Sequence, residues 1–259
     1  MALTLAYKEF GAGSPIVVLH GLFGSARNWQ AIAKRLATHH HVYTLDLRNH
    51  GASPWADTMS YREMAEDVAT FVEAHGLVSA TVLGHSMGGK VAMALALSRP
   101  TLVTRLVVAD IAPVTYAHSF LPYVQAMQDL NLGSIARRDE ADAALSERIP
   151  DATTRMLLLQ NLVLHDQHFD WRVNLPALAN TASELLGFPP FGSARYQGRA
   201  LFVHGERSAY VEPACHAVIR QLFPRAEIVA IAEAGHWLHV DQPARFLDTV
   251  QGFFRNDRS

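Results

Sequence analysis

Short apolar runs alternate with amphipathic stretches along most of the chain. Runs rich in Val, Ile and Leu that are bounded by Gly, Pro or charged residues are typical of strands buried on both faces of a sheet. They predict strands at residues 3–10, 16–19, 41–46, 80–83, 105–110, 199–205 and 226–231. Apolar positions three or four apart predict helices at residues 28–36, 61–75, 89–97, 213–223 and 243–254. This alternation predicts an α/β fold with a mostly parallel central sheet flanked by helices.

The alternation stops between residues 113 and 193. Amphipathic stretches there predict helices at 120–130, 140–148, 153–164 and 175–186. We therefore expect an all-helical cap, or lid, inserted into a core made of residues 1–112 and 194–259. Because ligands bind beyond the carboxyl ends of strands in such folds, we expect the cap to cover a substrate. A cap that only adds stability is the alternative.

The sequence Gly84-His85-Ser86-Met87-Gly88 lies between a predicted strand and a predicted helix. A Gly-x-Ser-x-Gly in this context is typical of a nucleophile elbow, a turn so sharp that its flanking residues need to be glycine. Strain in such a turn pushes the serine hydroxyl clear of the sheet, where a base can reach it. An ordinary Gly/Ser turn has the same composition, but the strand and helix around it favour Ser86 as a nucleophile.

Composition narrows the function classes. The 259 residues are 49% hydrophobic and 18% charged, with a net charge of −2, which is typical of a globular domain and provides no basic stripe for nucleic acid. A single cysteine, Cys215, rules out an internal disulfide and a thiolate metal site. No apolar stretch approaches the ~20 residues of a membrane span, and residues 1–9 lack the pattern of a secretion signal. We expect a cytoplasmic monomer or homodimer that needs no metal or cofactor.

Four separated motifs occur in an order that resembles the α/β-hydrolase superfamily. They are His20-Gly21 after a strand, Asp46 followed by Gly51-Ala52-Ser53, the elbow at Ser86, and Gly235-His236 near the end. Residues 46–54, 110–113 and 171–175 further resemble a subgroup of small bacterial esterases with mitochondrial relatives. Some bacterial members of that subgroup act on acyl-CoA thioesters. The resemblance implies a serine esterase whose partner is a small-molecule acyl ester or thioester.

The resemblance also implies which histidine acts as the base. A serine hydroxyl is a poor nucleophile at neutral pH, so an imidazole must take its proton during attack. The superfamily has this histidine in a loop after the last strand, and His236 follows the strand that ends near Ile231. Of the 14 histidines, only His236 combines this loop with this order. We expect His85 to pack or to line the pocket, and residues 39–41 to be solvated rather than metal-binding.

The histidine needs a carboxylate that fixes its tautomer and stabilises the imidazolium. The commonest family position lies in the loop Gly205-Glu206-Arg207-Ser208, where Ser208 replaces the expected Asp and cannot supply a charge. The other family position, at the end of the strand after the elbow helix, is occupied by Asp110. We therefore predict Asp110 as the acid, with Glu206 as its rival. Capping of the next turn is the alternative role for Asp110.

Ester hydrolysis also requires donors for the developing oxyanion. The elbow geometry predicts the backbone N–H of Met87 as one donor. The backbone N–H of Leu22, directly after His20-Gly21, is predicted as the second, with Phe23 as the near alternative. Candidates for lining the substrate pocket are His20, Phe23, His85, Trp171 and Trp237.

Several other charged residues have structural interpretations. Asp46 is interpreted as organising its loop, and Asp241 as preceding the last helix. A phosphate-bearing substrate would need cations near the entrance, but charges in the cap are usually a solvated face. The cap arginines are Arg137, Arg138, Arg155 and Arg172.

Other functions of this superfamily stay open from the sequence. The same triad serves lactone opening, haloperoxidase-like perhydrolysis and C–C bond hydrolysis, and the fold also hosts small-ligand receptors with little turnover. Haloalkane dehalogenase and epoxide hydrolase chemistry is disfavoured, because those relatives have Asp where this chain has Ser86. The sequence does not define the natural substrate.

Overall fold

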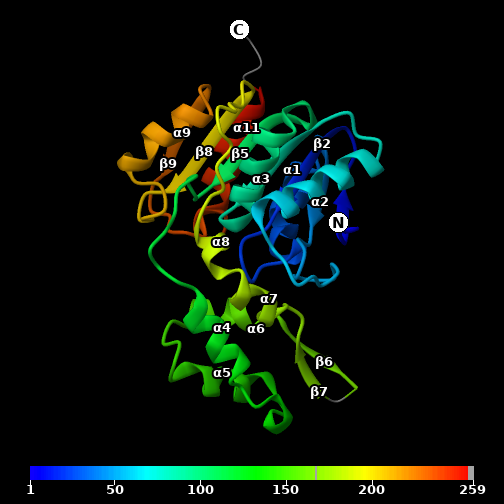
Figure 1. Cartoon of the computed structure of the whole chain (residues 1–259), viewed down its shortest axis with the longest axis vertical. Helices are drawn as coiled ribbons and strands as arrows, with labels where there is room; N and C mark the ends of the chain where they lie inside the picture. Colours follow the sequence, from blue (N-terminus) through cyan, green and yellow to red (C-terminus); the bar gives the residue numbers. More distant parts are fainter. Residues whose placement is uncertain (167, 256–259) are drawn as a thin grey trace.

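A seven-stranded sheet forms the centre of the molecule, with helices on both faces (Figure 1). The computed structural model describes residues 1–166 and 168–255. In the described residues, β1 pairs antiparallel with β3 and the other pairs of this sheet are parallel, as predicted. The strands, in spatial order, are β1 (Tyr7–Phe10), β3 (His40–Leu45), β2 (Ser14–Leu19), β4 (Ala80–His85), β5 (Val103–Ala109), β8 (Arg199–Gly205) and β9 (Ala226–Ile231).

The core lies on both faces of this sheet because successive strand residues point in opposite directions. In β2, Ile16 and Val18 belong to the apolar cluster on one face, whereas Val17 and Leu19 belong to the cluster on the other. Helices α1 (Gln30–Leu36) and α11 (Pro243–Arg255) cover the first face. The second face is covered by α2 (Tyr61–Ala74), α3 (Met87–Ser98) and α9 (His216–Leu222).

The predicted elements are found, with shifted ends. The first strand is shorter than residues 3–10, and the helix predicted at 28–36 begins with the 3₁₀ turn η1 (Ala26–Trp29). The 3₁₀ turn η4 (Pro213–Cys215) precedes α9. Two further short elements of the core are the 3₁₀ turn η2 (Pro100–Leu102) and α10 (Leu238–Asp241).

The segment between β5 and β8 folds outside the sheet, below it in Figure 1. We call this segment, residues 113–193, the cap. Its helices are α4 (Leu121–Gln128), the 3₁₀ turn η3 (Leu132–Ser134), α5 (Arg138–Ser146), α6 (Ala152–Leu159), α7 (Leu175–Asn180) and α8 (Ala182–Leu186).

The expectation that the cap is all-helical is wrong. Strands β6 (Leu162–His165) and β7 (His168–Trp171) form a separate two-stranded antiparallel sheet. The helix predicted at 153–164 ends before it, and the amide of Asn161 there donates to carbonyls of α6 and of the core loop at Phe23. The helix predicted at 175–186 is divided at Thr181, whose hydroxyl donates back to Ala177 O at 2.7 Å.

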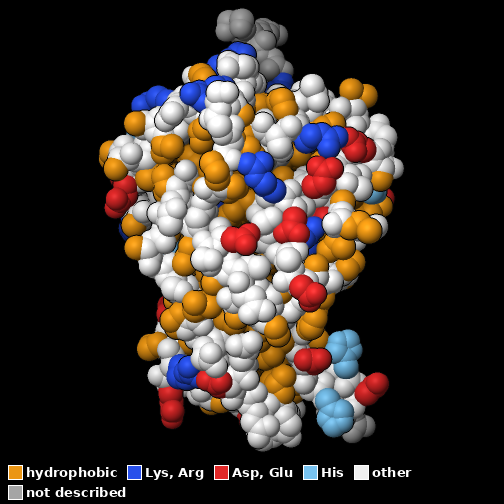
Figure 2. All heavy atoms as spheres, in the orientation of Figure 1, with side chains coloured by type: hydrophobic (Ala, Val, Ile, Leu, Met, Phe, Trp, Pro, Cys, Tyr) orange, Lys and Arg blue, Asp and Glu red, His pale blue; other side chains and the backbone are white. Residues whose placement is uncertain are grey.

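The face shown in Figure 2 has both acidic and basic side chains, over the core and over the cap. Within the described residues, no helix combines the length and apolar character that crossing a membrane requires.

Candidate active site

The elbow at Ser86 has a strained backbone that accounts for its glycines. Ser86 lies between β4 and α3 with φ 52° and ψ −121°. A Cβ added at Gly84 would lie 2.1 Å from the carbonyl oxygen of Gly88. A Cβ added at Gly88 would lie 2.5 Å from the carbonyl oxygens of Leu19 and His20. No side chain fits at either glycine, so the turn that presents Ser86 depends on both.

The structure brings His236 and Asp110 together. His236 is in the loop after β9, and its Nδ1 lies 2.7 Å from Oδ2 of Asp110. Asp110 directly follows β5 and is fully buried. Its Oδ1 accepts from the backbone N–H of Gly205 at 3.0 Å, and its Oδ2 accepts from the hydroxyl of Ser208. A buried carboxylate held by donors in this way fixes the orientation of the imidazole.

The rival acid points elsewhere. Glu206 is exposed, and its Oε2 accepts from the backbone N–H of Glu233 at 3.1 Å. Ser208, which has no charge to supply, instead donates to the carboxylate of Asp110. The only sequence signal that could have indicated this contact is the position of Ser208, which lies in the loop where the family commonly has the catalytic Asp.

Several contacts position the loop that carries His236. The ring of Tyr210 stacks on the imidazole with centroids 4.2 Å apart. His85 Nε2 lies 2.9 Å from the carbonyl oxygen of His236, and burial lowers the pKa of His85 well below its usual value, so the neutral ring donates this bond. Asp241 precedes the last helix, as expected, and its Oδ2 also accepts from the backbone N–H of Gly235 at 2.8 Å.

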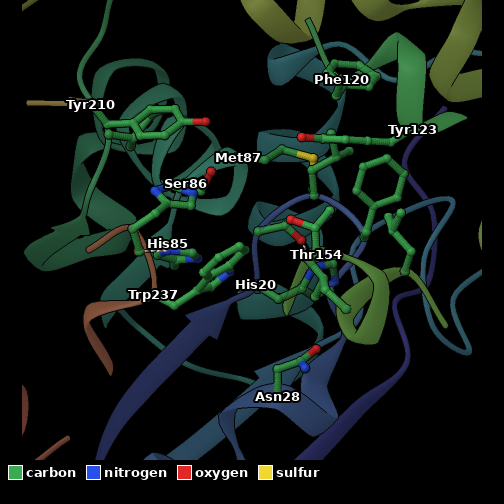
Figure 3. Close-up of a pocket in the computed structure, with 18 of the residues that line it drawn as sticks. His20, Asn28, His85, Ser86, Met87, Phe120, Tyr123, Thr154, Tyr210 and Trp237 are labelled. Carbon is green, nitrogen blue, oxygen red and sulfur yellow. Dashed lines mark hydrogen bonds between the residues drawn. The ribbon is translucent and has the colours of Figure 1, made fainter. Parts of the chain in front are cut away.

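Ser86 and His236 line the same cavity, shown in close-up in Figure 3. Among the described residues, no hydrogen bond joins the Ser86 hydroxyl to His236. Such contacts are often long before substrate binds and tighten in the complex.

The loop after β2 distinguishes between the two candidate oxyanion donors. The backbone N–H of Phe23 donates to Nε2 of His50 at 3.2 Å, so it is already used. Burial lowers the pKa of His50 to about 3, which keeps this ring neutral and able to accept. The backbone N–H of Leu22 is therefore the better candidate, and Leu22 and Met87 both line the cavity beside Ser86.

The side chain of His20 stabilises the same loop through two hydrogen bonds. Its Nε2 accepts from the backbone N–H of Leu47 at 3.0 Å, which places its proton on Nδ1. Nδ1 then donates to the carbonyl of Gly21 at 2.8 Å. Asp46 connects two further loops, because its carboxylate accepts from the backbone N–H groups of Ala26 and Ala52 at 2.7 and 2.8 Å.

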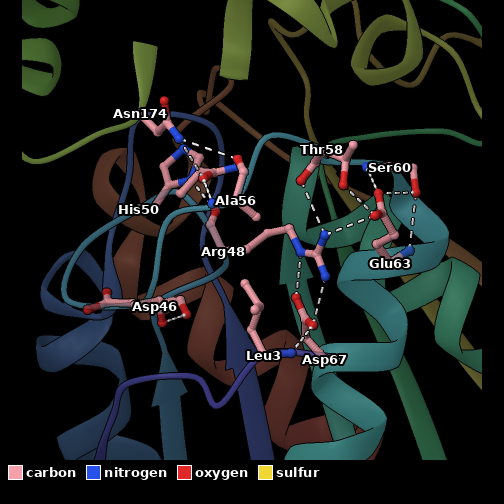
Figure 4. Close-up of polar contacts among 12 residues, drawn as sticks. Leu3, Asp46, Arg48, His50, Ala56, Thr58, Ser60, Glu63, Asp67 and Asn174 are labelled. Atoms are coloured by element: carbon pink, nitrogen blue, oxygen red, sulfur yellow. Dashed lines mark hydrogen bonds and ion pairs between the residues drawn. The ribbon is translucent and has the colours of Figure 1, made fainter. Parts of the chain in front are cut away.

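The segment after Asp46 also fastens the core to the cap (Figure 4). Buried Arg48 donates to both carboxylate oxygens of Asp67 on α2, at 2.7 and 2.9 Å. The amide of Asn174 in the cap donates to Oδ1 of Asn49 at 3.0 Å. These polar contacts fix the loop that includes His50, although Nδ2 of Asn49 is buried there without a hydrogen-bond partner.

The cavity at Ser86 has a volume of about 570 Å³ and lies between the core and the cap. Of the predicted lining residues, His20, Phe23, His85 and Trp237 are found there. The prediction for Trp171 is wrong: its side chain is buried in the cap, where the indole N–H donates to Met127 O at 3.0 Å. Sequence reasoning missed further lining residues, because helical spacing does not show which face meets the cavity: Tyr61, Lys90, Tyr116, Tyr123 and Leu185.

Lys90 is an unusual member of this lining. It lies on α3, is 1% exposed, and donates from Nζ to the carbonyls of Val114 and Leu186 at 2.9 Å each, and also to that of Gly187. Its ammonium also faces the ring of Tyr116 at 4.8 Å. Burial lowers the pKa of Lys90 to about 7. One side chain thus joins α3 to both ends of the cap.

In the part of the chain that the structure describes, no group of three or more His, Cys, Asp or Glu side chains is placed to hold a metal ion. The groups assembled around Ser86 are those that acyl transfer requires. They are a serine on a strained turn, an imidazole, a buried carboxylate and backbone N–H donors.

The mostly parallel sheet and the elbow between β4 and α3 define the α/β-hydrolase fold. The sequence model described as the alpha/beta hydrolase fold matches residues 14–243, and the chain belongs to this family.

Relatives place the chain among the esterases and lipases of this family. The sn-1-specific diacylglycerol lipase ABHD11 of Mus musculus is 42% identical over 246 residues, which cover 92% of this chain and 80% of that protein. Esterase YbfF of Escherichia coli is 32% identical over 244 residues and 94% of each chain. The solved structure of a marine microorganism esterase matches with a TM-score of 0.94 at 36% identity, covering 97% of this chain and 100% of that one. The protein is a serine hydrolase of the ester-cleaving class.

Proposed function

We propose that this protein hydrolyses carboxylic esters with an apolar acyl group through a covalent acyl-enzyme on Ser86. His236 is the base and Asp110 the acid. The observation that carries the proposal is the contact of 2.7 Å between the buried Asp110 and His236, beside the cavity that contains the strained Ser86.

In the first half-reaction, the Ser86 hydroxyl attacks the ester carbonyl while Nε2 of His236 takes its proton. Negative charge develops on the carbonyl oxygen between the backbone N–H groups of Leu22 and Met87. Met87 is the first residue of α3, so the helix dipole also favours this charge. Asp110 stabilises the imidazolium, which then gives its proton to the departing alcohol oxygen.

In the second half-reaction, a water molecule attacks the acyl-serine, and His236 takes one of its protons. Collapse of the second tetrahedral intermediate breaks the bond to Ser86 Oγ, which recovers its proton from His236. The carboxylic acid leaves and the enzyme is regenerated. A thioester follows the same steps with a thiolate as the leaving group, so acyl-CoA thioesters fall within the proposal.

The cavity supports an apolar acyl group. Phe120 and Tyr123 from the cap and Trp237 from the histidine loop surround it in Figure 3, together with Leu157 and Leu185. Esterase and lipase are also the activities in the names of the relatives, which supports an ester rather than an amide substrate.

The test is hydrolysis of p-nitrophenyl esters from acetate to dodecanoate by the wild type and by Ser86→Ala. We expect activity that disappears in Ser86→Ala, with an optimum chain length that reports the size of the cavity. A fluorophosphonate probe should label Ser86 in the wild type and label it more slowly in His236→Ala. Turnover by Ser86→Ala at the wild-type rate would refute the proposal, and ligand binding by a folded wild type without any turnover would indicate a receptor instead.

A further inference from the structure

A second cavity of about 530 Å³ adjoins the one at Ser86. We call it the arginine cleft, and its lining consists of Arg27, Asn28, Arg138, Gln160 and Arg172. Asn28 and Gln160 also line the cavity at Ser86, and the amide of Asn28 donates to Oε1 of Gln160 at 2.6 Å. This bond joins the core to the cap. The two cavities therefore share these two lining residues, which form a polar bridge between them.

The arginines of the cleft differ from those around them. The cap arginines outside it pair with carboxylates: Arg137 with Asp139, Arg148 with Asp129, and Arg155 with Asp142. Among the described residues, the three arginines of the cleft have no carboxylate partner and no carboxylate lines it.

The contacts that these arginines do make leave charge facing the cleft. Arg138 donates to the backbone carbonyls of Leu159 and Leu162, and Arg172 donates to that of Gln160 at 3.3 Å. Nε of Arg172 is buried without a hydrogen-bond partner. Carbonyl contacts hold these guanidinium groups in place, but they do not neutralise them.

Guanidinium groups stay protonated at neutral pH, so three of them that face one cavity repel each other. An anion bound between them would offset this repulsion. Their planar, forked donors match the oxygens of a phosphate, and a phosphate with two negative charges offsets more of this field than a carboxylate does. The arginine cleft therefore has the charge and the type of donor that a phosphate site requires.

We propose that the arginine cleft binds a phosphate group on the alcohol or thiol part of the substrate. The proposal rests on the proposed function, because it extends the same substrate from Ser86 past the Asn28–Gln160 bridge. The apolar cavity takes the acyl chain, so the charged group belongs to the part of the substrate that departs first. Recognition by the cleft selects phosphate-bearing esters over neutral ones.

The first test compares substrates that share an acyl group and differ in phosphate. One pair is butanoyl-CoA and S-butanoyl-N-acetylcysteamine; the other is butanoylglycerol 3-phosphate and butanoylglycerol. In the double variant Arg27→Gln/Arg172→Gln, we expect KM for a phosphate-bearing member to rise about tenfold or more, with kcat and the neutral partner changed less than about twofold. The pair that responds identifies the carrier of the phosphate. Arg137→Gln, an exposed cap arginine outside the cleft, is the control and should change nothing.

Equal losses on charged and neutral substrates, or no loss on either, would overturn the proposal. A binding measurement separates this result from failure of the proposed hydrolysis. Titration of the Ser86→Ala variant with CoA and with glycerol 3-phosphate should show binding that weakens with added salt and is lost in Ser86→Ala/Arg27→Gln/Arg172→Gln. Hydrolysis of p-nitrophenyl butanoate by Arg27→Gln/Arg172→Gln reports on the triad alone and should match the wild type.

Discussion

The hydroxyl of Ser208 donates to Oδ2 of Asp110, the same oxygen that lies 2.7 Å from Nδ1 of His236. Ser208 belongs to the loop after β8, whereas Asp110 directly follows β5. The loop that commonly carries the acid in this superfamily therefore still reaches the acid here, as a hydrogen-bond donor. This arrangement is the geometric basis for assigning the charge to Asp110.

The acid can be tested by removing its charge at constant shape. Asp110→Asn should lower kcat by about 10³- to 10⁴-fold, because an amide at this position favours the wrong tautomer of the imidazole. Glu206→Gln should change kcat less than about twofold, since Glu206 is exposed and contacts Glu233. Steady-state kinetics on one p-nitrophenyl ester decides between them. A large loss in Glu206→Gln with normal activity in Asp110→Asn would reverse the assignment.

The contribution of Ser208 is expected to be smaller and confined to kcat. Ser208→Ala removes one donor from a buried carboxylate, so we expect about a tenfold loss in kcat with KM unchanged. Ser208→Thr retains the hydroxyl and should recover most of that loss. If Ser208→Ala and wild type have the same kcat, Ser208 does not position Asp110.

The elbow glycines should tolerate no side chain. Gly84→Ala would bring a Cβ to 2.1 Å from the carbonyl oxygen of Gly88, so we expect the free energy of unfolding to fall by about 3 kcal/mol or more and activity to collapse. Gly252→Ala is the matched control, because a Cβ there in α11 has no heavy atom within 4 Å. It should raise the free energy of unfolding by about 0.5–1 kcal/mol. Urea unfolding measures both, and a stable, active Gly84→Ala would contradict the elbow geometry.

Buried histidines should make the protein less stable in acid. Burial lowers the pKa of His239 to about 3, and its ring stacks on Trp29 with centroids 4.2 Å apart. Below its unfolded value of 6.5, the unfolded chain takes up a proton that the folded chain does not. The free energy of unfolding therefore falls as pH drops from about 6.5 toward 3, by up to about 1.4 kcal/mol per pH unit for this group.

The variant His239→Phe tests this dependence. Phenylalanine preserves the stack on Trp29 and removes Nδ1 of His239, which is buried without a partner. Between pH 6 and 4, we expect the free energy of unfolding to fall less in His239→Phe than in the wild type. At neutral pH, the variant should be as stable as the wild type. Urea unfolding across this range gives the slope, and an unchanged slope would mean that His239 does not titrate with unfolding.

The fold could be predicted largely because its central strands are buried on both faces. A continuous apolar run as short as residues 16–19, bounded by Pro15 and His20-Gly21, is typical of a central strand and too short for a helix. The elbow at Ser86 requires glycine at fixed positions, which is a signal local in the sequence. The interpretation of His236 as the base came from the resemblance, because the superfamily has its histidine in the loop after the last strand.

The features that were missed depend on contacts between distant segments. The hydroxyl that donates to Asp110 comes from a loop 98 residues away, and the position of Ser208 in that loop does not by itself show which side chain it reaches. Trp171 has the same amphipathic spacing whether it faces the cavity or, as observed, the interior of the cap. The hairpin β6–β7 was missed because a short apolar run fits the period of a helix as well as that of a strand.

The hydrogen bonds of Lys90 have a mechanical consequence. The carbonyls at both ends of the cap bind one ammonium on the helix that follows the nucleophile, so neither end of the cap is a free hinge. Swinging the whole cap away would strip this ammonium of its carbonyl partners inside an apolar interior. The same movement would also break the hydrogen bonds of Asn161 and Asn174 to the core, so smaller movements that keep Lys90 in place require less free energy.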